Sequence, residues 1–279
     1  AGIATFRNDV NIGAAVTISE SGIDAVGLGI TCANINGGQI GGRRNLIING
    51  AMNVAQRGTS STSEGYYTVD RFYVGRGGTD EAPEQAQTDL SSSGHDATVY
   101  NLGFRKSLRV QNGNQSGGVG TGDYILITYT IEAQDIANSG WNYTSTSSFI
   151  TLSFYVLSSV AQNYYGYLQS KDGTQQRYAF ETGTLTANTW TKVVLKISGN
   201  PNLQFDNDPN AGLELTLWPF AGTNYTDSGV SLNAWGAYNS SQRMPDFGAA
   251  MDDWYTTNDA TFEITGVQLE VGSVATDFE

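Results

Sequence analysis

The chain has 279 residues and a formal net charge of -13, with 34 glycines but a single histidine and a single cysteine. An acidic surface repels nucleic acid and anionic membranes, and no run approaches the roughly 18 apolar residues that span a bilayer, so we expect neither as a partner. One histidine and one cysteine exclude an internal disulfide and the zinc or Ser-His-Asp sites that need several of these residues, while 11% aromatic residues indicate a folded chain.

The first segment, residues 1–44, is rich in glycine and poor in aromatic residues. Its apolar residues alternate along the chain, first at Val10, Ile12, Ala14, Val16 and Ile18 and then at Val26, Leu28, Ile30 and Cys32. This period of two predicts short β-strands, which cannot cover an apolar face alone. We therefore predict that residues 1–44 form a β-stem that trimerises around a common axis. A flexible glycine-rich linker is the alternative, although a linker does not need the alternation.

The second segment, residues 45–279, carries all of the net charge and a succession of strand-like stretches bounded by Gly, Asn, Asp or Ser. The expected strands are 46–48, 71–74, 107–110, 124–131, 149–157, 164–169, 176–180, 189–197, 213–217 and 261–271. In the stretch 149–157 one parity is apolar, at Ile150, Leu152, Phe154 and Val156. About ten antiparallel strands predict a β-sandwich of jelly-roll type, and the best helical candidate is the short stretch 133–138. The expected fold class is thus all-β, a trimeric β-stem followed by an antiparallel sandwich.

Both ends of the second segment resemble a known family. The sequence NLIINGAMNVAQRG at 45–58, with YTVDRF at 67–72, resembles the opening of a domain found in bacteriophage tail fibres and other virion appendages, notably of marine and cyanobacterial phages. The sequence ITGVQLEVG at 264–272, with ATDFE at 275–279, is similar to its closing strand. The resemblance implies a jelly roll like that of carbohydrate-binding modules, in which the first and last strands lie side by side. GIATF at 2–6 and VNIGAA at 10–15 also resemble the repeats of fibre shafts.

These motifs are mainly structural. Asn49-Gly50 and Arg57-Gly58 are turn dipeptides. In Asp70-Arg71-Phe72 we expect the two charged side chains to anchor the start of a strand while Phe72 points inward. The resemblance implies a location in the virion, with sister subunits, other virion proteins and a host-surface glycan as partners, and it carries over no enzymatic residue.

Aromatic residues in loops are the candidates for glycan binding. A sugar site uses flat aromatic faces against the apolar faces of the ring, with polar side chains fixing the hydroxyls. The candidate binding residues are three pairs, Trp141 with Tyr143, Trp235 with Tyr238, and Trp254 with Tyr255. Core packing or loop anchoring is the alternative for each. Trp190 and Trp218 lie in strand stretches, so we expect both in the core.

Acidic residues suggest one metal site and no catalytic pair. Asp206 and Asp208 belong to a run with oxygen ligands at every second position, as in calcium loops, although the glycine and glutamate of an EF-hand are missing. Structural calcium is therefore one candidate for this run, and an Asx-rich turn without a metal is the default. No other cofactor is expected. Asp252 and Asp253 are adjacent, so in a strand they would face opposite sides and could not form the acid pair of a glycosidase. In a loop they could instead converge with another acid.

The interpretation that follows is a non-enzymatic virion fibre fragment, whose trimeric head recognises a host-surface glycan. Three heads on one axis raise weak single-site binding through effective concentration. One alternative is a purely structural tail or capsid-decoration protein that contacts other virion proteins. A second is a polysaccharide depolymerase, against which the shortage of histidines and convergent acids argues.

Overall fold

A computed structural model describes residues 16–19, 22–25 and 45–279. Strand β1 (Val16–Ser19) pairs with β2 (Gly22–Ala25) in antiparallel register, with Val16 opposite Ala25. These two short strands belong to the predicted stem. The rest of the stem, including Cys32, lies outside the described residues, and its trimerisation stays a prediction. No helix in the described part is long and apolar enough to cross a membrane.

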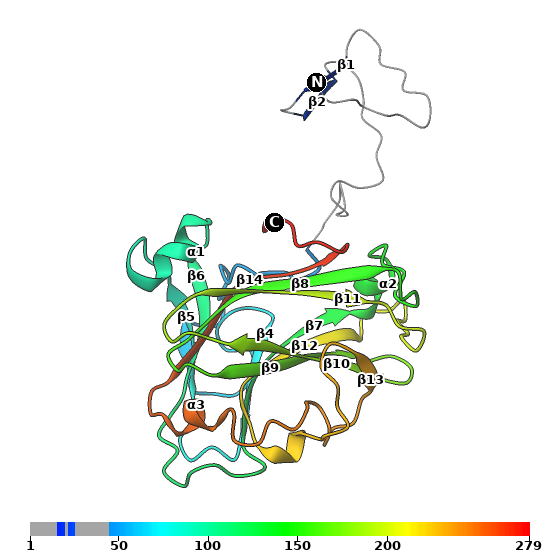
Figure 1. Cartoon of the computed structure of the whole chain (residues 1–279). Helices are drawn as coiled ribbons and strands as arrows, with labels where there is room; N and C mark the ends of the chain where they lie inside the picture. The colour runs from blue at the N-terminus through cyan, green and yellow to red at the C-terminus, as the bar shows by residue number, and fades with distance from the viewer. Residues whose placement is uncertain (1–15, 20–21, 26–44) are drawn as a thin grey trace, which may run out of the picture.

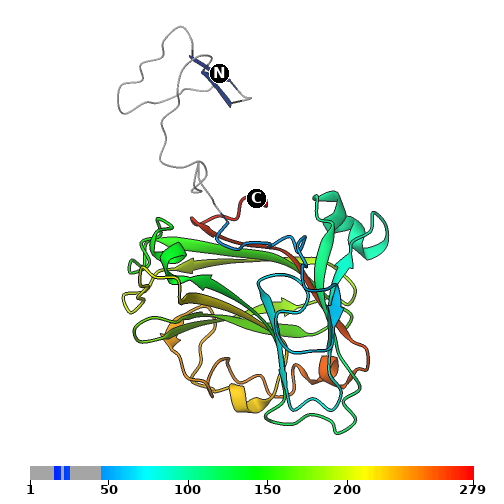
Figure 2. The same ribbon diagram turned by 180° about the vertical axis from the view of Figure 1, so that it is seen from behind.

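Residues 45–279 form two antiparallel six-stranded sheets, which lie one above the other in Figures 1 and 2. We name each sheet after one of its strands. The β7 sheet has the order β13-β10-β9-β12-β7-β4, made of β4 (Phe72–Gly77), β7 (Tyr124–Glu132), β9 (Asn163–Ser170), β10 (Gln176–Thr184), β12 (Ala211–Ala221) and β13 (Trp235–Ala237). The β14 sheet has the order β11-β8-β14-β6-β5-β3, made of β3 (Ser60–Ser61), β5 (Glu84–Asp89), β6 (Lys106–Gln111), β8 (Phe149–Ser158), β11 (Thr191–Ser198) and β14 (Thr261–Val271). The predicted all-β sandwich of jelly-roll type is confirmed.

The core lies between the inner faces of the two sheets. Ile150, Leu152, Phe154 and Val156 on β8 are all fully buried, as the alternation predicts. Each such side chain contributes about 1.5–3 kcal/mol by leaving water. Helical structure is limited to α1 (Ala97–Asn101), α2 (Ala133–Ala137), α3 (Asp252–Thr256) and the 3-10 turns η1 (Gly94–Asp96) and η2 (Thr223–Tyr225). The helix α2 coincides with the predicted stretch 133–138.

Part of the outer face of the β14 sheet is also covered, which alternation alone does not predict. Thr151 and Ser153 point away from the core yet are 0% and 4% exposed. Helix α1 and its loop stand at one end of this sheet in both views (Figures 1 and 2). They bring a second apolar cluster to the sheet, made of Leu90, Val99, Phe104, Leu157 and Trp190. Trp190 is therefore buried as expected, but in this outer cluster, where its indole N–H donates to Asp96 Oδ1 at 3.2 Å.

The opening and closing segments of the sandwich lie side by side, as the resemblance implies. Leu46 N donates to Leu269 O at 2.8 Å, and Val267 N donates to Gly50 O at 2.9 Å. The predicted strand 46–48 is nevertheless wrong, because the chain turns at once and Met52 N donates back to Asn49 O at 2.9 Å. The turn at Asn49-Gly50 is thus confirmed, and it interrupts the strand before a ladder can form.

Candidate functional site

The outer face of the β7 sheet carries a pocket of about 340 Å³. Tyr66, Tyr73, Tyr167 and Tyr238 stand around it, and we name it the tyrosine pocket. Its floor consists of outward-facing side chains from β7, β12 and β9, namely Leu126, Thr128, Thr130, Glu214, Thr216 and Gln169, and its remaining lining residues are Lys171 and Arg243. The volume lies at the lower end of the roughly 300–1,000 Å³ that small-molecule pockets occupy.

Strand register sets the central row of this pocket. Tyr73 on β4 lies opposite Thr128 on β7, Thr128 lies opposite Thr216 on β12, and Thr216 lies opposite Tyr167 on β9. Four neighbouring strands therefore present Tyr, Thr, Thr and Tyr in one line across the sheet. At about 4.8 Å per strand, the backbones of the two tyrosines stand about 14 Å apart, with two hydroxyl groups between them.

Each tyrosine of this row has a second tyrosine beside it. Tyr66, which is 43% exposed, meets Tyr73 edge to face, with ring centroids 5.4 Å apart and planes at 68°. Tyr238 lies beside Tyr167, with centroids 6.3 Å apart and planes at 44°. The Tyr238 backbone N–H donates to Gln175 O at 2.9 Å, which holds its loop against the sheet. The pocket thus has aromatic walls on two sides.

The polar floor keeps hydrogen-bonding capacity. Thr128 Oγ1 and Thr216 Oγ1 lie 3.3 Å apart, so one hydroxyl donates to the other. At one end, Lys171 Nζ lies 3.3 Å from Glu214 Oε2. Hydroxyl and carboxylate oxygens have more than one acceptor site, and an ammonium has three donors. These groups can therefore bind the hydroxyls of a ligand while their own contacts persist.

The phenols of Tyr73 and Tyr167 stay neutral at ordinary pH. Burial raises the pKa of Tyr73, and its hydrogen bond to the Glu64 carboxylate raises that pKa further. Burial also raises the pKa of Tyr167, an effect that the positive charge of Arg243 partly opposes. A neutral phenol both donates and accepts, so both walls offer an apolar face with a polar tip.

Arg243 belongs to the segment between β12 and α3, which runs along the outer side of the β7 sheet (Figures 1 and 2). Its guanidinium carbon lies 5.2 Å from the ring centroid of Tyr225 and 5.6 Å from that of Trp218. Trp218 is fully buried, as its strand position predicts, but beneath this segment rather than between the sheets.

Of the six aromatic residues predicted to bind glycan, Tyr238 lines the tyrosine pocket and Trp235 does not. Trp235 is half-buried on the edge strand β13, where its indole N–H donates to Ser198 O at 2.8 Å and its ring lies 5.4 Å from that of Tyr178. It lines a separate pocket of about 440 Å³ together with Gln176 and Gln204. The two members of this predicted pair therefore face different sites.

In the other two pairs Trp141, Trp254 and Tyr255 are corrected, because their rings are buried, while Tyr143 stays a prediction. Trp141 is 3% exposed and packs with Tyr143, which is half-buried, against Phe205. Trp254 is 0% exposed, with its indole N–H donating to Thr261 O at 3.0 Å. Tyr255 is 1% exposed and stacks on Phe220 at 3.9 Å. Trp141, Trp254 and Tyr255 offer no exposed face to a sugar.

The acidic run of the predicted calcium site forms a local turn. Asp208 Oδ1 accepts from the backbone N–H of Asn210 at 3.0 Å, and its Oδ2 accepts from the Asn210 side chain at 2.6 Å. Asp206 Oδ1 accepts from Gln204 at 3.1 Å. Throughout the described ranges, no group of three or more His, Cys, Asp or Glu is placed to hold a metal ion. The geometry at Asp206 and Asp208 is that of the Asx-rich turn.

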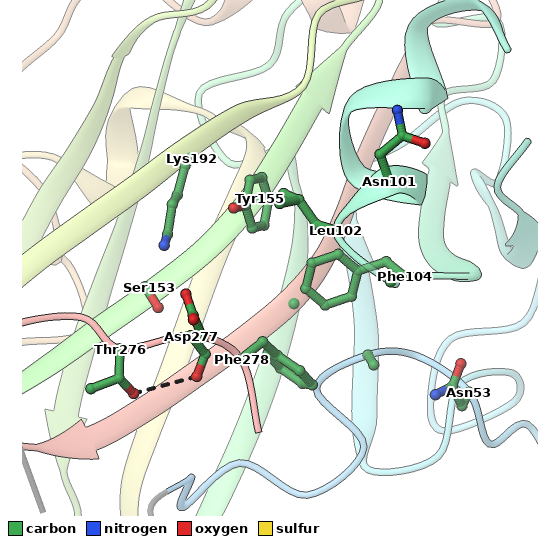
Figure 3. A pocket seen from close by; sticks show the side chains of 13 residues that line it. Asn53, Asn101, Leu102, Phe104, Ser153, Tyr155, Lys192, Thr276, Asp277 and Phe278 are labelled. Atoms are coloured by element: carbon green, nitrogen blue, oxygen red, sulfur yellow. Dashed lines mark hydrogen bonds between the residues drawn. The ribbon is translucent and has the colours of Figure 1, made fainter. Parts of the chain in front are cut away.

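A second pocket, of about 590 Å³, lies on the outer face of the β14 sheet (Figure 3). Three aromatic rings occupy one side, where Phe104 lies 5.1 Å from Phe278 and 5.5 Å from Tyr155. The Lys192 side chain reaches toward Ser153 and Asp277 on the other side (Figure 3). These rings pack mainly against one another and hold the closing segment on the sheet, which gives them a structural role.

No protein-family model and no curated protein sequence matches the chain. Solved structures similar to it include the enzymatically active domain of tailspike protein 4 from bacteriophage CBA120, with a TM-score of 0.40 and 11% identity over 81% of this chain and 21% of that one. Another is the N-terminal cellulose-binding domain of Cellulomonas fimi β-1,4-glucanase C, with a TM-score of 0.36 and 10% identity over 80% and 100%. The baseplate tripod of bacteriophage Tuc2009 has a TM-score of 0.33 and 12% identity over 85% and 58%.

Proposed function

We propose that the sandwich of residues 45–279 binds carbohydrate in the tyrosine pocket. The observation that carries the proposal is the row Tyr73, Thr128, Thr216 and Tyr167 across four hydrogen-bonded strands. A sugar ring has apolar C–H faces and a polar rim of hydroxyls, which matches aromatic walls above a floor of hydroxyl, amide and carboxylate groups. The proposed action is binding without catalysis. Glu214 is the one carboxylate among the described residues that line the pocket, and a glycosidase needs two.

The proposed biological role is recognition of a host-surface glycan by a virion appendage, with other virion proteins as neighbours. This role is supported by the resemblance of residues 45–58 and 264–279 to the ends of phage appendage domains. We expect a single open pocket of this size to bind a glycan weakly. Trimerisation through residues 1–44 would raise the total affinity through effective concentration. A protein that only builds the appendage is the rival function, and it requires no glycan ligand.

Neighbouring tyrosines provide a matched test. Tyr66 lines the pocket and is 43% exposed, whereas Tyr67 is 47% exposed and does not line it. On a glycan array probed with the full chain, we expect Tyr66→Ala to weaken the strongest signal about 2-fold to 10-fold. Tyr67→Ala should leave that signal unchanged. An unmodified protein that binds no glycan, or equal losses in both variants, would refute binding in this pocket.

A further inference from the structure

Arg243 is held rigidly at the wall of the tyrosine pocket. The backbone N–H groups of Arg243 and Met244 both donate to Tyr225 O, at 2.9 and 3.2 Å. Met244 is fully buried, which fixes the backbone beside it. The guanidinium then lies over the rings of Tyr225 and Trp218. A planar cation over aromatic rings is stabilised there, and its N–H edge stays oriented for an acceptor.

The described residues provide no acceptor for the Arg243 guanidinium. Among the described residues no carboxylate lies within 4 Å of its guanidinium, and its Nε is buried without a hydrogen-bond partner. The indole nitrogen of Trp218, in the same ring cluster, is likewise without one. The other cation of the pocket differs, because Lys171 pairs with Glu214 at 3.3 Å. The Arg243 side chain therefore lines a pocket that faces solvent and has no carboxylate partner in the described part of the chain.

The charge of the pocket is opposite in sign to that of the whole protein. Arg243 and Lys171 against Glu214 leave one net positive charge in the lining, while the chain carries -13. Beyond a Debye length of about 8 Å at physiological salt, the acidic surface is largely screened from a single anion at Arg243. A densely charged polymer would bring further negative charges onto that surface. The balance favours a ligand with isolated acidic groups.

We propose that the tyrosine pocket selects an acidic glycan, in which the carboxylate of a uronic acid accepts hydrogen bonds from the Arg243 guanidinium while neutral sugar units lie along the tyrosines. The inference rests on the proposed function and names its ligand class. A carboxylate offers two coplanar oxygens, which match the edge of a guanidinium whose faces are turned to rings. The acid distinguishes this ligand from a neutral glycan of the same backbone.

The test uses matched ligands with the full chain. Glucuronoxylan and gellan, whose uronic acids are separated by neutral sugars, are each compared with a carboxyl-reduced preparation, in which the acid becomes a CH2OH group and the backbone is kept. We expect the protein to bind at least one acidic form about tenfold or more tightly than its reduced counterpart. Arg243→Gln should lower the affinity for that acidic form to the level of the reduced form. It should change the affinity for the reduced form less than about twofold.

Two further variants separate recognition from folding. Arg105 lies 3.9 Å over the Tyr100 ring and outside the pocket, so Arg105→Gln is the control and should bind as the unmodified protein does. Arg243→Lys keeps the positive charge but loses the planar edge of paired N–H donors, so we expect an intermediate affinity for the acidic form. If Arg243→Gln fails to fold, the comparison of acidic and reduced ligands on the unmodified protein still tests the inference. Equal binding of acidic and reduced forms would overturn this inference and leave the proposed function standing, whereas binding of no glycan would overturn both.

Discussion

The side-chain oxygen of Asn45 accepts the backbone N–H of Leu269 at 3.0 Å and so ties the first residue of the sandwich to its last strand. The same oxygen accepts from Ile47 N at 2.9 Å, and the Asn45 amide donates to Val267 O at 3.2 Å. Asn45 is 6% exposed, so these contacts are shielded from water. The Asn45 side chain thus joins the opening segment of the sandwich to its closing strand β14, in place of the backbone ladder that an opening strand would form.

We expect Asn45→Ala to lower the free energy of unfolding of the full chain by about 3 kcal/mol. The substitution leaves buried donors and an acceptor unpaired, and each such group costs about 1–3 kcal/mol. Urea denaturation followed by tryptophan fluorescence measures the change. Asn53→Ala is the control, because Asn53 is exposed. A loss below about 0.5 kcal/mol, which is typical of surface positions, would show that the side chain is not needed for closure.

Gly50 gives a second prediction at the same junction. A Cβ atom added to Gly50 would stand 2.0 Å from Val267 O, a backbone atom that itself belongs to the pairing of the two segments. We expect Gly50→Ala to destabilise the fold by at least about 2 kcal/mol through this overlap. At Gly122, where the nearest atom to an added Cβ is a side-chain nitrogen at 3.5 Å, alanine should be tolerated. Equal urea midpoints for the two variants would contradict the close approach.

Alternation along the chain predicts most of the sandwich because each strand buries one face. The stretches 261–271 and 149–157 coincide with β14 and nearly with β8. Strand β5, with the sequence EQAQTD, was not predicted, since its ladder with β6 is made by the backbone of mostly polar residues. In Asp70-Arg71-Phe72 the structure confirms that Phe72 is buried and that Asp70 is an anchor, which accepts from Gln56 N at 3.1 Å. Arg71 instead occupies a turn at φ 72°.

The candidate site was harder to predict, because it depends on register between strands far apart in sequence. The outward parity of Thr128 is visible in the stretch 124–131, but nothing in the sequence places it between Tyr73 and Thr216. A position outside the predicted strands also does not make an aromatic side chain exposed, as Trp141 and Trp254 show. Trp254 follows two aspartates in a stretch whose composition is typical of a loop, yet it is the middle residue of the short helix α3, where it is fully buried. Of the predicted aromatic residues, Tyr238 lines the tyrosine pocket because the segment that carries it lies against the sheet.

The stem prediction can be tested by mass. Short strands within residues 1–44 need other copies to cover their apolar face. We therefore expect the full chain to be a trimer of about 89 kDa, three times 29.8 kDa. Light scattering coupled to size exclusion measures this directly, and a variant with Val16→Asp and Ile18→Asp should be a folded monomer. An unmodified chain that stays at 29.8 kDa under dilution would remove the basis for avidity, while the tyrosine pocket would be unaffected.

Buried tyrosines should limit stability at alkaline pH. Burial raises the pKa of Tyr164, Tyr167 and Tyr255 above the ordinary value near 10. A group whose folded pKa is raised stabilises the fold fully below its unfolded pKa, and this contribution is lost as pH rises from about 10 toward the folded value. We expect melting temperatures that are level up to about pH 9.5 and fall steeply above pH 10. The part of the phenolate absorbance at 295 nm that comes from the buried rings should appear together with unfolding. Exposed Tyr67 is the control, since Tyr67→Phe should not move the alkaline midpoint, whereas Tyr164→Phe should raise it relative to its own stability at pH 7. Phenolate absorbance that rises completely near pH 10 in a protein that stays folded would show that these three rings, including that of Tyr167, are open to solvent.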